Sequence, residues 1–206
     1  MAQKSAPMKR PPLIVGLAEA VSDVLNPPAV TGAMGLALAI SPAMTVPLWP
    51  ALGWGLLHGV LASLIPAVYI VYLFKTGAIG DLHMARRQDR HRPFVLGVTT
   101  AVVAWVLLAA FDAPQPFQRL ALFDVGLLAA IAIINVWWQI SIHGATIVGV
   151  VTISGVVFGL PVALWASPLV LLVAWARLYL RRHTVNQMIA GAGIGVLVAL
   201  VVFVAV

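Results

Sequence analysis

The stretch ARLYLRRHTVNQ, residues 176–187, places Arg177, Arg181, Arg182 and His183 at the boundary between two strongly apolar segments. The segment before it runs over about 167–180, and the segment after it over 188–206. Basic side chains gathered where one apolar run ends and the next begins are typical of a helical membrane protein. The rest of the chain repeats this pattern.

The composition predicts an integral membrane protein. The chain has 206 residues, of which 62% are hydrophobic and 9% charged, and its mean hydropathy is +1.05. A soluble domain carries roughly a quarter charged residues. Cysteine is absent, which excludes disulfides, a thiolate nucleophile and a cysteine metal site. The net charge of +6 indicates membrane topology and an anionic lipid or phosphate partner rather than nucleic acid.

We predict an all-α, polytopic bundle of six or seven transmembrane helices. Residues 11–25 favour an amphipathic helix in the membrane interface, so that 1–25 form a basic N-terminal segment and 26–206 one membrane domain. No cleavable signal peptide is expected. Helix breaks are predicted at VPLWP (46–50), DAPQPF (112–117) and WASP (165–168). The apolar runs lie at about 26–46, 51–74, 94–111, 118–138, 144–164, 167–180 and 188–206.

Small and polar residues inside these runs predict contacts between helices. His58, inside the second run, is expected to form a hydrogen bond between helices. Glycines four residues apart allow helix backbones to approach closely. They occur at Gly55 and Gly59, Gly155 and Gly159, and Gly191 and Gly195.

The basic residues fall almost entirely on one predicted membrane face. If the chain has seven spans, only Arg119 falls on the other face. The positive-inside rule then makes the basic face cytoplasmic. A basic active site would create the same imbalance. The residues on the basic face are Lys4, Lys9, Arg10, Lys75, Arg86, Arg87, Arg90, Arg92, Arg177, Arg181 and Arg182.

Three polar segments are predicted to meet at that face. They are KTGAIGDLHMARRQDRHRPF (75–94), WWQISIHGAT (137–146) and ARLYLRRHTVNQ (176–187). Arginine forks fit phosphate oxygens. One of His143 and His183 could act as a nucleophile and the other as a general acid. Such a set can transfer phosphate without a metal or another cofactor. Asp81 and Asp89 are expected to pair with the arginines of the loop 86–92 and order it.

The three segments resemble the signature of the type 2 phosphatidic acid phosphatase superfamily, the lipid phosphate phosphatases. Arg92 and Pro93 match the end of its first motif, and Ser141 and His143 match its second. Arg177 and His183 match its third with the five-residue interval preserved. The resemblance covers about residues 75–190 and implies the fold of that superfamily.

The resemblance also implies a role for each matched residue. His183 would form a phosphohistidine, and His143 would protonate the leaving lipid oxygen. Arg92, Arg177 and Ser141 would hold phosphate, helped by backbone N–H groups near Gly144. The implied activity is metal-independent hydrolysis of a lipid phosphate or diphosphate, of the phosphatidic acid, phosphatidylglycerophosphate or polyprenyl type.

The sequence departs from the family pattern at five places. Ala85 occupies the family's Lys position, and Arg86 is the expected substitute. Gln187 stands where the family has Asp, as in a divergent prokaryotic-type branch, and its carbonyl could still orient the His183 ring. The other departures are Ile140, Ile142 and Ala176.

These departures leave a second function open, namely a non-catalytic subunit that binds lipid phosphate. Taken alone, the arginine loop is explained by membrane topology, and each histidine by a polar helix end. A small transporter is a third possibility, although no repeated half supports it. The lipid, the membrane face of the site and the oligomeric state are not determined by the sequence.

Overall fold

The computed structural model describes residues 11–42, 44–82, 84 and 86–205. Lys4, Lys9, Arg10 and the departure at Ala85 lie outside the described residues. All regular structure in the described part of the chain is helical, as predicted. The elements are α1 (Pro12–Val24), α2 (Pro27–Ala39), α3 (Leu48–His58), the π-helix η1 (Gly59–Leu64), α4 (Ile65–Lys75), the 3₁₀ turn η2 (Arg87–Arg90), α5 (His91–Ala110), α6 (Gln115–Asn135), α7 (Ile142–Phe158), α8 (Leu160–Tyr179), α9 (Val185–Leu200) and the π-helix η3 (Val201–Ala205).

The protein is built as a multi-pass integral membrane protein. Within the described residues, five helical segments are long and apolar enough to cross a membrane, and six if α1 and α2, bent by 50°, count as one span. One of them joins α3, η1 and α4 into a single stretch, Leu48–Lys75. Helix α7, with 17 residues, is shorter than the ~20 residues a straight span needs.

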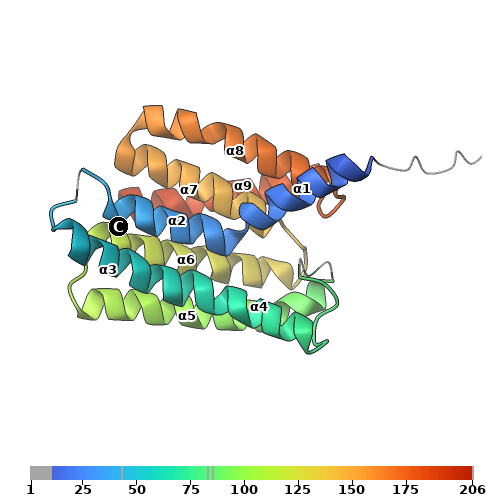
Figure 1. Ribbon diagram of the computed structural model, residues 1–206, viewed down its shortest axis with the longest axis horizontal. Helices are drawn as coiled ribbons and strands as arrows, with labels where there is room; N and C mark the ends of the chain where they lie inside the picture. Colours follow the sequence, from blue (N-terminus) through green and yellow to red (C-terminus); the bar gives the residue numbers. More distant parts are fainter. Residues whose placement is uncertain (1–10, 43, 83, 85, 206) are drawn as a thin grey trace, which may run out of the picture.

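The helices pack side by side around α6 (Figure 1). Helix α6 packs against α5, α9 and α2, and α7 packs against α9 and α8. The α6 side chains Phe117, Phe123 and Leu127 are buried in the main hydrophobic core. Large apolar side chains cover much of the outside, among them Trp165 and Leu171 on α8. Such a surface is suited to contact with lipid.

Helix α1 forms as predicted, and its packing explains its two faces. Ala18 and Ser22 are buried on a helix that packs against α8. Leu13 and Leu17 remain exposed, which is the arrangement expected where an apolar face meets lipid.

One predicted helix break is wrong. The WASP stretch lies inside α8, with Pro168 within the helix, and the break falls at Gly159 instead. Gly159 has φ of +94°, a conformation that side chains other than glycine rarely adopt. Pro161 follows in the first turn of α8, where its fixed φ favours helix initiation.

The predicted close approach of glycines occurs at Gly55, Gly191 and Gly195. A Cβ on Gly191 would collide with the backbone oxygen of Ser141, and a Cβ on Gly195 with that of Ala145. Between α2 and α3, Gly55 lies against Gly35, whereas a Cβ on Gly59 would meet open space, so the close approach predicted there is wrong. The contacts at Gly191 and Gly195 bring α9 directly onto α7.

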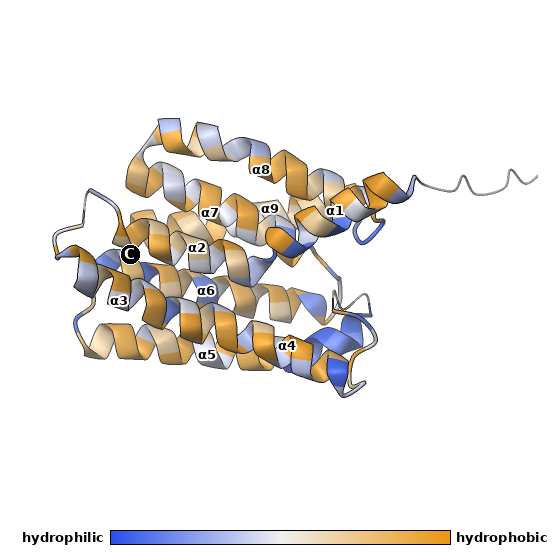
Figure 2. Cartoon of the chain, in the orientation of Figure 1, coloured by the Kyte–Doolittle hydropathy of each residue, from blue (hydrophilic) through white to orange (hydrophobic). Residues whose placement is uncertain are grey.

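Polar residues gather at one end of the bundle (Figure 2). This end holds the loop before α5, the start of α7 and the turn between α8 and α9. Arg119 lies in the first half of α6. It donates to the carbonyl of Phe203, near the C-terminus, at 3.4 Å. We call the end that holds the loop before α5, the start of α7 and the turn between α8 and α9 the arginine end.

Candidate functional site at the arginine end

The three segments singled out in the sequence meet at the arginine end. Arg90, in the turn before α5, donates from Nη1 to the carbonyl of Ile140 at 3.5 Å. The backbone N–H of Ser141 donates to the carbonyl of Gln187 at 3.1 Å. The loop before α5, the start of α7 and the start of α9 are therefore joined by hydrogen bonds.

A cavity of about 350 Å³ opens beside these segments. Its polar lining at this end comes from Arg90, Arg177, His143 and Asp23, and most of the remaining lining is apolar. The cavity lies between the joint of α1 with α2 on one side and α4 on the other, since Asn26 and Ile70 both line it. A polar head and an apolar body could occupy it together.

Arg177 is the most unusual side chain of the site. It is 1% exposed, and its Nε and Nη1 have no hydrogen-bond partner. A guanidinium carries only donors, so these buried groups, which find no acceptor among the described residues, suit a bound anion. Arg177 lies in the last turn of α8, on the buried face of that helix together with Ala176.

Arg90, rather than Arg92, is the first-motif arginine that points into the site. Arg90 is buried, and its Nε donates to the carbonyl of Met84 at 3.0 Å. Arg92 is exposed and does not line the cavity. Phe94 and Gly97 are buried on α5, and residue 90 shares their helical face whereas residue 92 does not.

Arg86, expected to replace the family's Lys, does not reach the cavity either. Its side chain is 71% exposed, and its Nε lies 3.3 Å from an Asp89 oxygen. The expected pairing of Asp89 with a loop arginine is therefore present. Asp81 pairs across to Arg182 at 3.3 Å, which ties the loop to the turn before α9.

Gln187 holds the His183 ring as predicted. His183 Nδ1 lies 3.2 Å from Gln187 Oε1, and the same oxygen accepts the backbone N–H of Thr184 at 3.0 Å. The Thr184 N–H requires an acceptor, which fixes the amide oxygen on this side. His183 must then donate from Nδ1, so the lone pair of the neutral ring lies on Nε2.

His183 stays uncharged over a wide pH range. Its burial, followed by the positive charges of Arg177 and Arg90, lowers the pKa of His183 to about 3. Nε2 is buried and has no hydrogen-bond partner. A neutral imidazole with a free lone pair beside arginine is a nucleophile suited to phosphorus. His183 does not itself line the cavity.

The second-motif residues divide between the cavity and the start of α7. His143 lines the cavity. Ser141 is fully buried, and its Oγ accepts the N–H of Gly144 at 3.2 Å as the N-cap of α7. Ser141 and Gly144 thus hold the helix start that presents His143, and neither lines the cavity.

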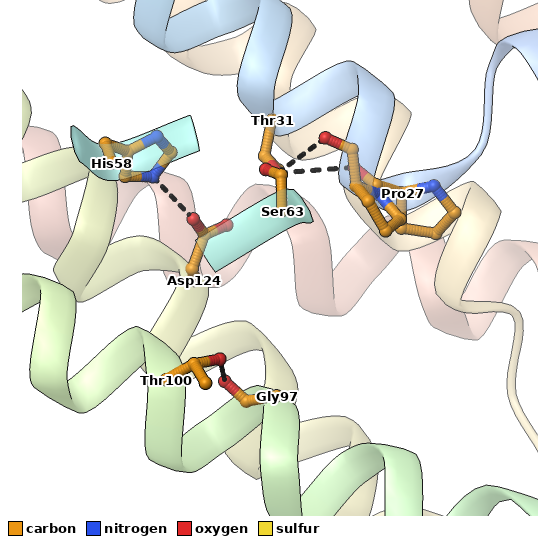
Figure 3. Close-up of polar contacts among 8 residues, drawn as sticks. Pro27, Thr31, His58, Ser63, Gly97, Thr100 and Asp124 are labelled. Carbon is orange, nitrogen blue, oxygen red and sulfur yellow. Dashed lines mark hydrogen bonds and ion pairs between the residues drawn. The ribbon is translucent and has the colours of Figure 1, made fainter. Parts of the chain in front are cut away.

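A second buried polar cluster lies deeper in the bundle (Figure 3). His58 Nε2 lies 2.8 Å from Asp124 Oδ2, and Thr31 Oγ1 lies 3.2 Å from Ser63 Oγ. The helix-to-helix hydrogen bond predicted for His58 is confirmed, with Asp124 as the partner. Asp124 and Thr31 also line the cavity, a role that their sequence positions inside apolar runs did not indicate.

The chemistry of the arginine end suits an anion. In the part of the chain that the structure describes, no three His, Asp or Glu side chains are grouped as metal ligands.

No family model, curated protein or solved structure matches this chain.

Proposed function

We propose that this protein hydrolyses a lipid phosphate or diphosphate through a phosphohistidine on His183, and that its bundle is of the lipid phosphate phosphatase type. The observation that carries the proposal is the pairing of buried, unpartnered Arg177 donors with a neutral His183 whose Nε2 bears the lone pair. Phosphate oxygens supply the acceptors that Arg177 lacks. The apolar cavity beside them suits the lipid part of the substrate.

In the first step His183 Nε2 attacks the terminal phosphorus, and the bond from that phosphorus to the leaving oxygen breaks. This oxygen belongs to the lipid alcohol in a monophosphate and to the lipid monophosphate in a diphosphate. His143 donates a proton to that oxygen, and the lipid product leaves. In the second step His143 takes a proton from water, and the resulting hydroxide attacks phosphorus. The phosphorus–nitrogen bond breaks, which releases phosphate and restores the neutral His183.

The arginines stabilise the charge that develops on the phosphoryl oxygens. Arg177 and Arg90 take this role in our proposal, with Arg90 in the place that the motif match gave to Arg92. Since Nε2 of His183 is covered in this structure, binding of phosphate must move the side chains over it. Attraction to the two guanidinium groups favours that movement.

We propose that this site lies at the cytoplasmic face of a prokaryotic cell membrane, and the charge distribution supports the choice of face. The described lysines and arginines, apart from Arg119, belong to the segments of the arginine end or to the helix ends beside it. The positive-inside rule assigns such a face to the cytoplasm.

The test is release of inorganic phosphate by detergent-purified protein. The substrates are phosphatidic acid, phosphatidylglycerophosphate, and farnesyl and undecaprenyl phosphates and diphosphates, each with and without a chelator. We expect chelator-resistant release that His183→Ala abolishes. Retained release in His183→Ala would contradict the phosphohistidine.

A matched pair of arginine variants tests the assignment of the phosphate ligand. Arg90→Ala should lower kcat/KM by about 10²–10³-fold, the effect of removing one donor to a transition-state oxygen. Arg92→Ala, an exposed neighbour two residues away, should stay close to wild type. A larger loss in Arg92→Ala would contradict the assignment. Binding of the substrates without release would support the alternative function of a non-catalytic subunit.

A further inference from the structure

The cavity beside Arg177 continues into the middle of the bundle. Its lining runs from Arg90 and Arg177 at the arginine end to Asp124. Asp124 lies near the middle of α6, about 16 Å along the helix from the end at Asn135. That depth is about half the ~30 Å thickness of the hydrocarbon core.

Small residues create the space between these two ends. Ala62 and Ala67, from the stretch Leu48–Lys75, line the cavity together with Gly97 of α5. The volume of about 350 Å³ is near the lower end of the range for pockets that hold one small molecule. One hydrocarbon chain attached to a phosphate fits this volume better than the two chains of a phosphatidate.

The inner end of the cavity is polar. Asp124 is bonded to His58 at 2.8 Å, and Thr31 on the adjoining wall lies 3.2 Å from Ser63 (Figure 3). The π-helix η1 contains Ser63 and begins directly after His58. A hydrocarbon chain offers no hydrogen bond, so pushing it against this cluster would break polar contacts without replacing them.

We propose that the cavity binds a single hydrocarbon chain and that the His58–Asp124 pair sets the greatest chain length it accepts. This inference rests on the proposed function for the identity of the phosphate head. The substrate class is then a phosphate ester of one chain, alkyl or prenyl, that ends before mid-membrane. Farnesyl phosphate belongs to this class, and undecaprenyl phosphate and phosphatidic acid are poorer ligands.

The test measures thermal stabilisation of the purified protein by alkylphosphonates from hexyl to octadecyl, which the protein cannot hydrolyse at the carbon–phosphorus bond. Affinity is compared at equal mole fraction in the detergent micelle, so that every chain starts from an apolar medium. We expect similar affinities up to a limiting length and a drop of about tenfold or more beyond it, the effect of leaving a buried polar group unpaired.

Two variants should move this limit in opposite directions. His58→Leu combined with Asp124→Leu replaces the polar pair by apolar side chains and should extend the limit to longer chains. Ala67→Phe narrows the cavity about 12 Å from the end of α4 at Lys75, and should shorten it. Ser154→Ala is the control, because Ser154 is buried on α7 and does not line the cavity.

The outcomes separate this inference from the proposed function. A length limit that shifts with the variants, in a protein that releases no phosphate, would keep the chain site and reject the phosphatase. Phosphate release with equal binding of all lengths, or with no binding of any phosphonate, would reject the length limit and keep the phosphatase. If the double variant does not fold, an unchanged limit in Ala67→Phe is enough to overturn the inference.

Discussion

The arginine end and the polar cluster at mid-membrane differ in what their buried groups still lack. At the arginine end, Arg177 has two buried nitrogens without an acceptor, and nothing in the described chain supplies one. At mid-membrane, His58 Nε2 and Asp124 pair through a 2.8 Å contact, and only Nδ1 of the His58 ring is left without a partner among the described residues. The first arrangement costs stability unless an anion binds, whereas the second holds helices together by itself.

Breaking the mid-membrane pair should have the largest effect on stability. Asp124→Ala leaves His58 without its partner inside the bundle, and removal of one member of a buried pair costs about 3–5 kcal/mol. Thermal unfolding in detergent should therefore shift to a lower temperature. Ser63→Ala, which removes a hydroxyl contact on the same helical stretch, should cost about 0.6 kcal/mol. Equal losses in the two variants would contradict the pairing.

Removing Arg177 should lower the activity without lowering the stability of the protein. Arg177→Leu eliminates donors that have no acceptor, so the unfolding temperature without ligand should stay the same or rise. Phosphate release should fall by about 10²–10³-fold. Arg177→Lys keeps the charge but not the fork, and should also lose most of the activity. A marked loss of stability in Arg177→Leu would show that the arginine is structural.

Separating α9 from α7 should disturb the arginine end through its backbone. Gly191→Ala places a Cβ against the backbone oxygen of Ser141, and overpacking of this kind costs about 1–3 kcal/mol. The Gly193 position has open space, so Gly193→Ala should be neutral or slightly stabilising. Unfolding temperatures of the two variants compare them directly.

A pH dependence of stability distinguishes His183 from an ordinary histidine. Its folded pKa is lowered to about 3, so between about pH 6.5 and pH 3 the unfolded chain binds a proton that the folded chain does not. His183 therefore lowers stability progressively as the pH falls through this window, by at most about 1.4 kcal/mol per pH unit. Above the unfolded pKa this effect is absent.

His183→Gln should remove that part of the pH dependence. Unfolding temperatures of wild type and variant, measured from pH 7 to pH 4, should differ in slope. Parallel curves would show that His183 titrates with an ordinary pKa in the folded protein.

The sequence predicted the helical membrane class and the meeting of three segments because both follow from long apolar runs and their order. It did not identify which arginine faces inward. Matching by motif selects Arg92, whereas the rotation of α5 points Arg90 inward. The buried face that includes Phe94 and Gly97, extended back by one turn, would have found Arg90.

Two other features depend on tertiary contacts that one sequence does not show. Proline predicts a helix break at 165–168, but Pro168 is accommodated within α8 and Gly159 makes the turn before that helix. His58 and Asp124 are 66 positions apart, and no local pattern links them. Their pairing appears only when the helices are packed.

The shared oxygen of Gln187 has a consequence for how this sequence can change over generations. Oε1 accepts both the backbone N–H of Thr184, which precedes α9, and the ring N–H of His183, so one atom holds both the start of the helix and the imidazole. A drift from Gln187 to Asp would add a charge for the ring but shorten the reach needed for the capping box with Thr184. Positions 184 and 187 are therefore expected to covary, and neither can be exchanged alone in a lineage that keeps both functions.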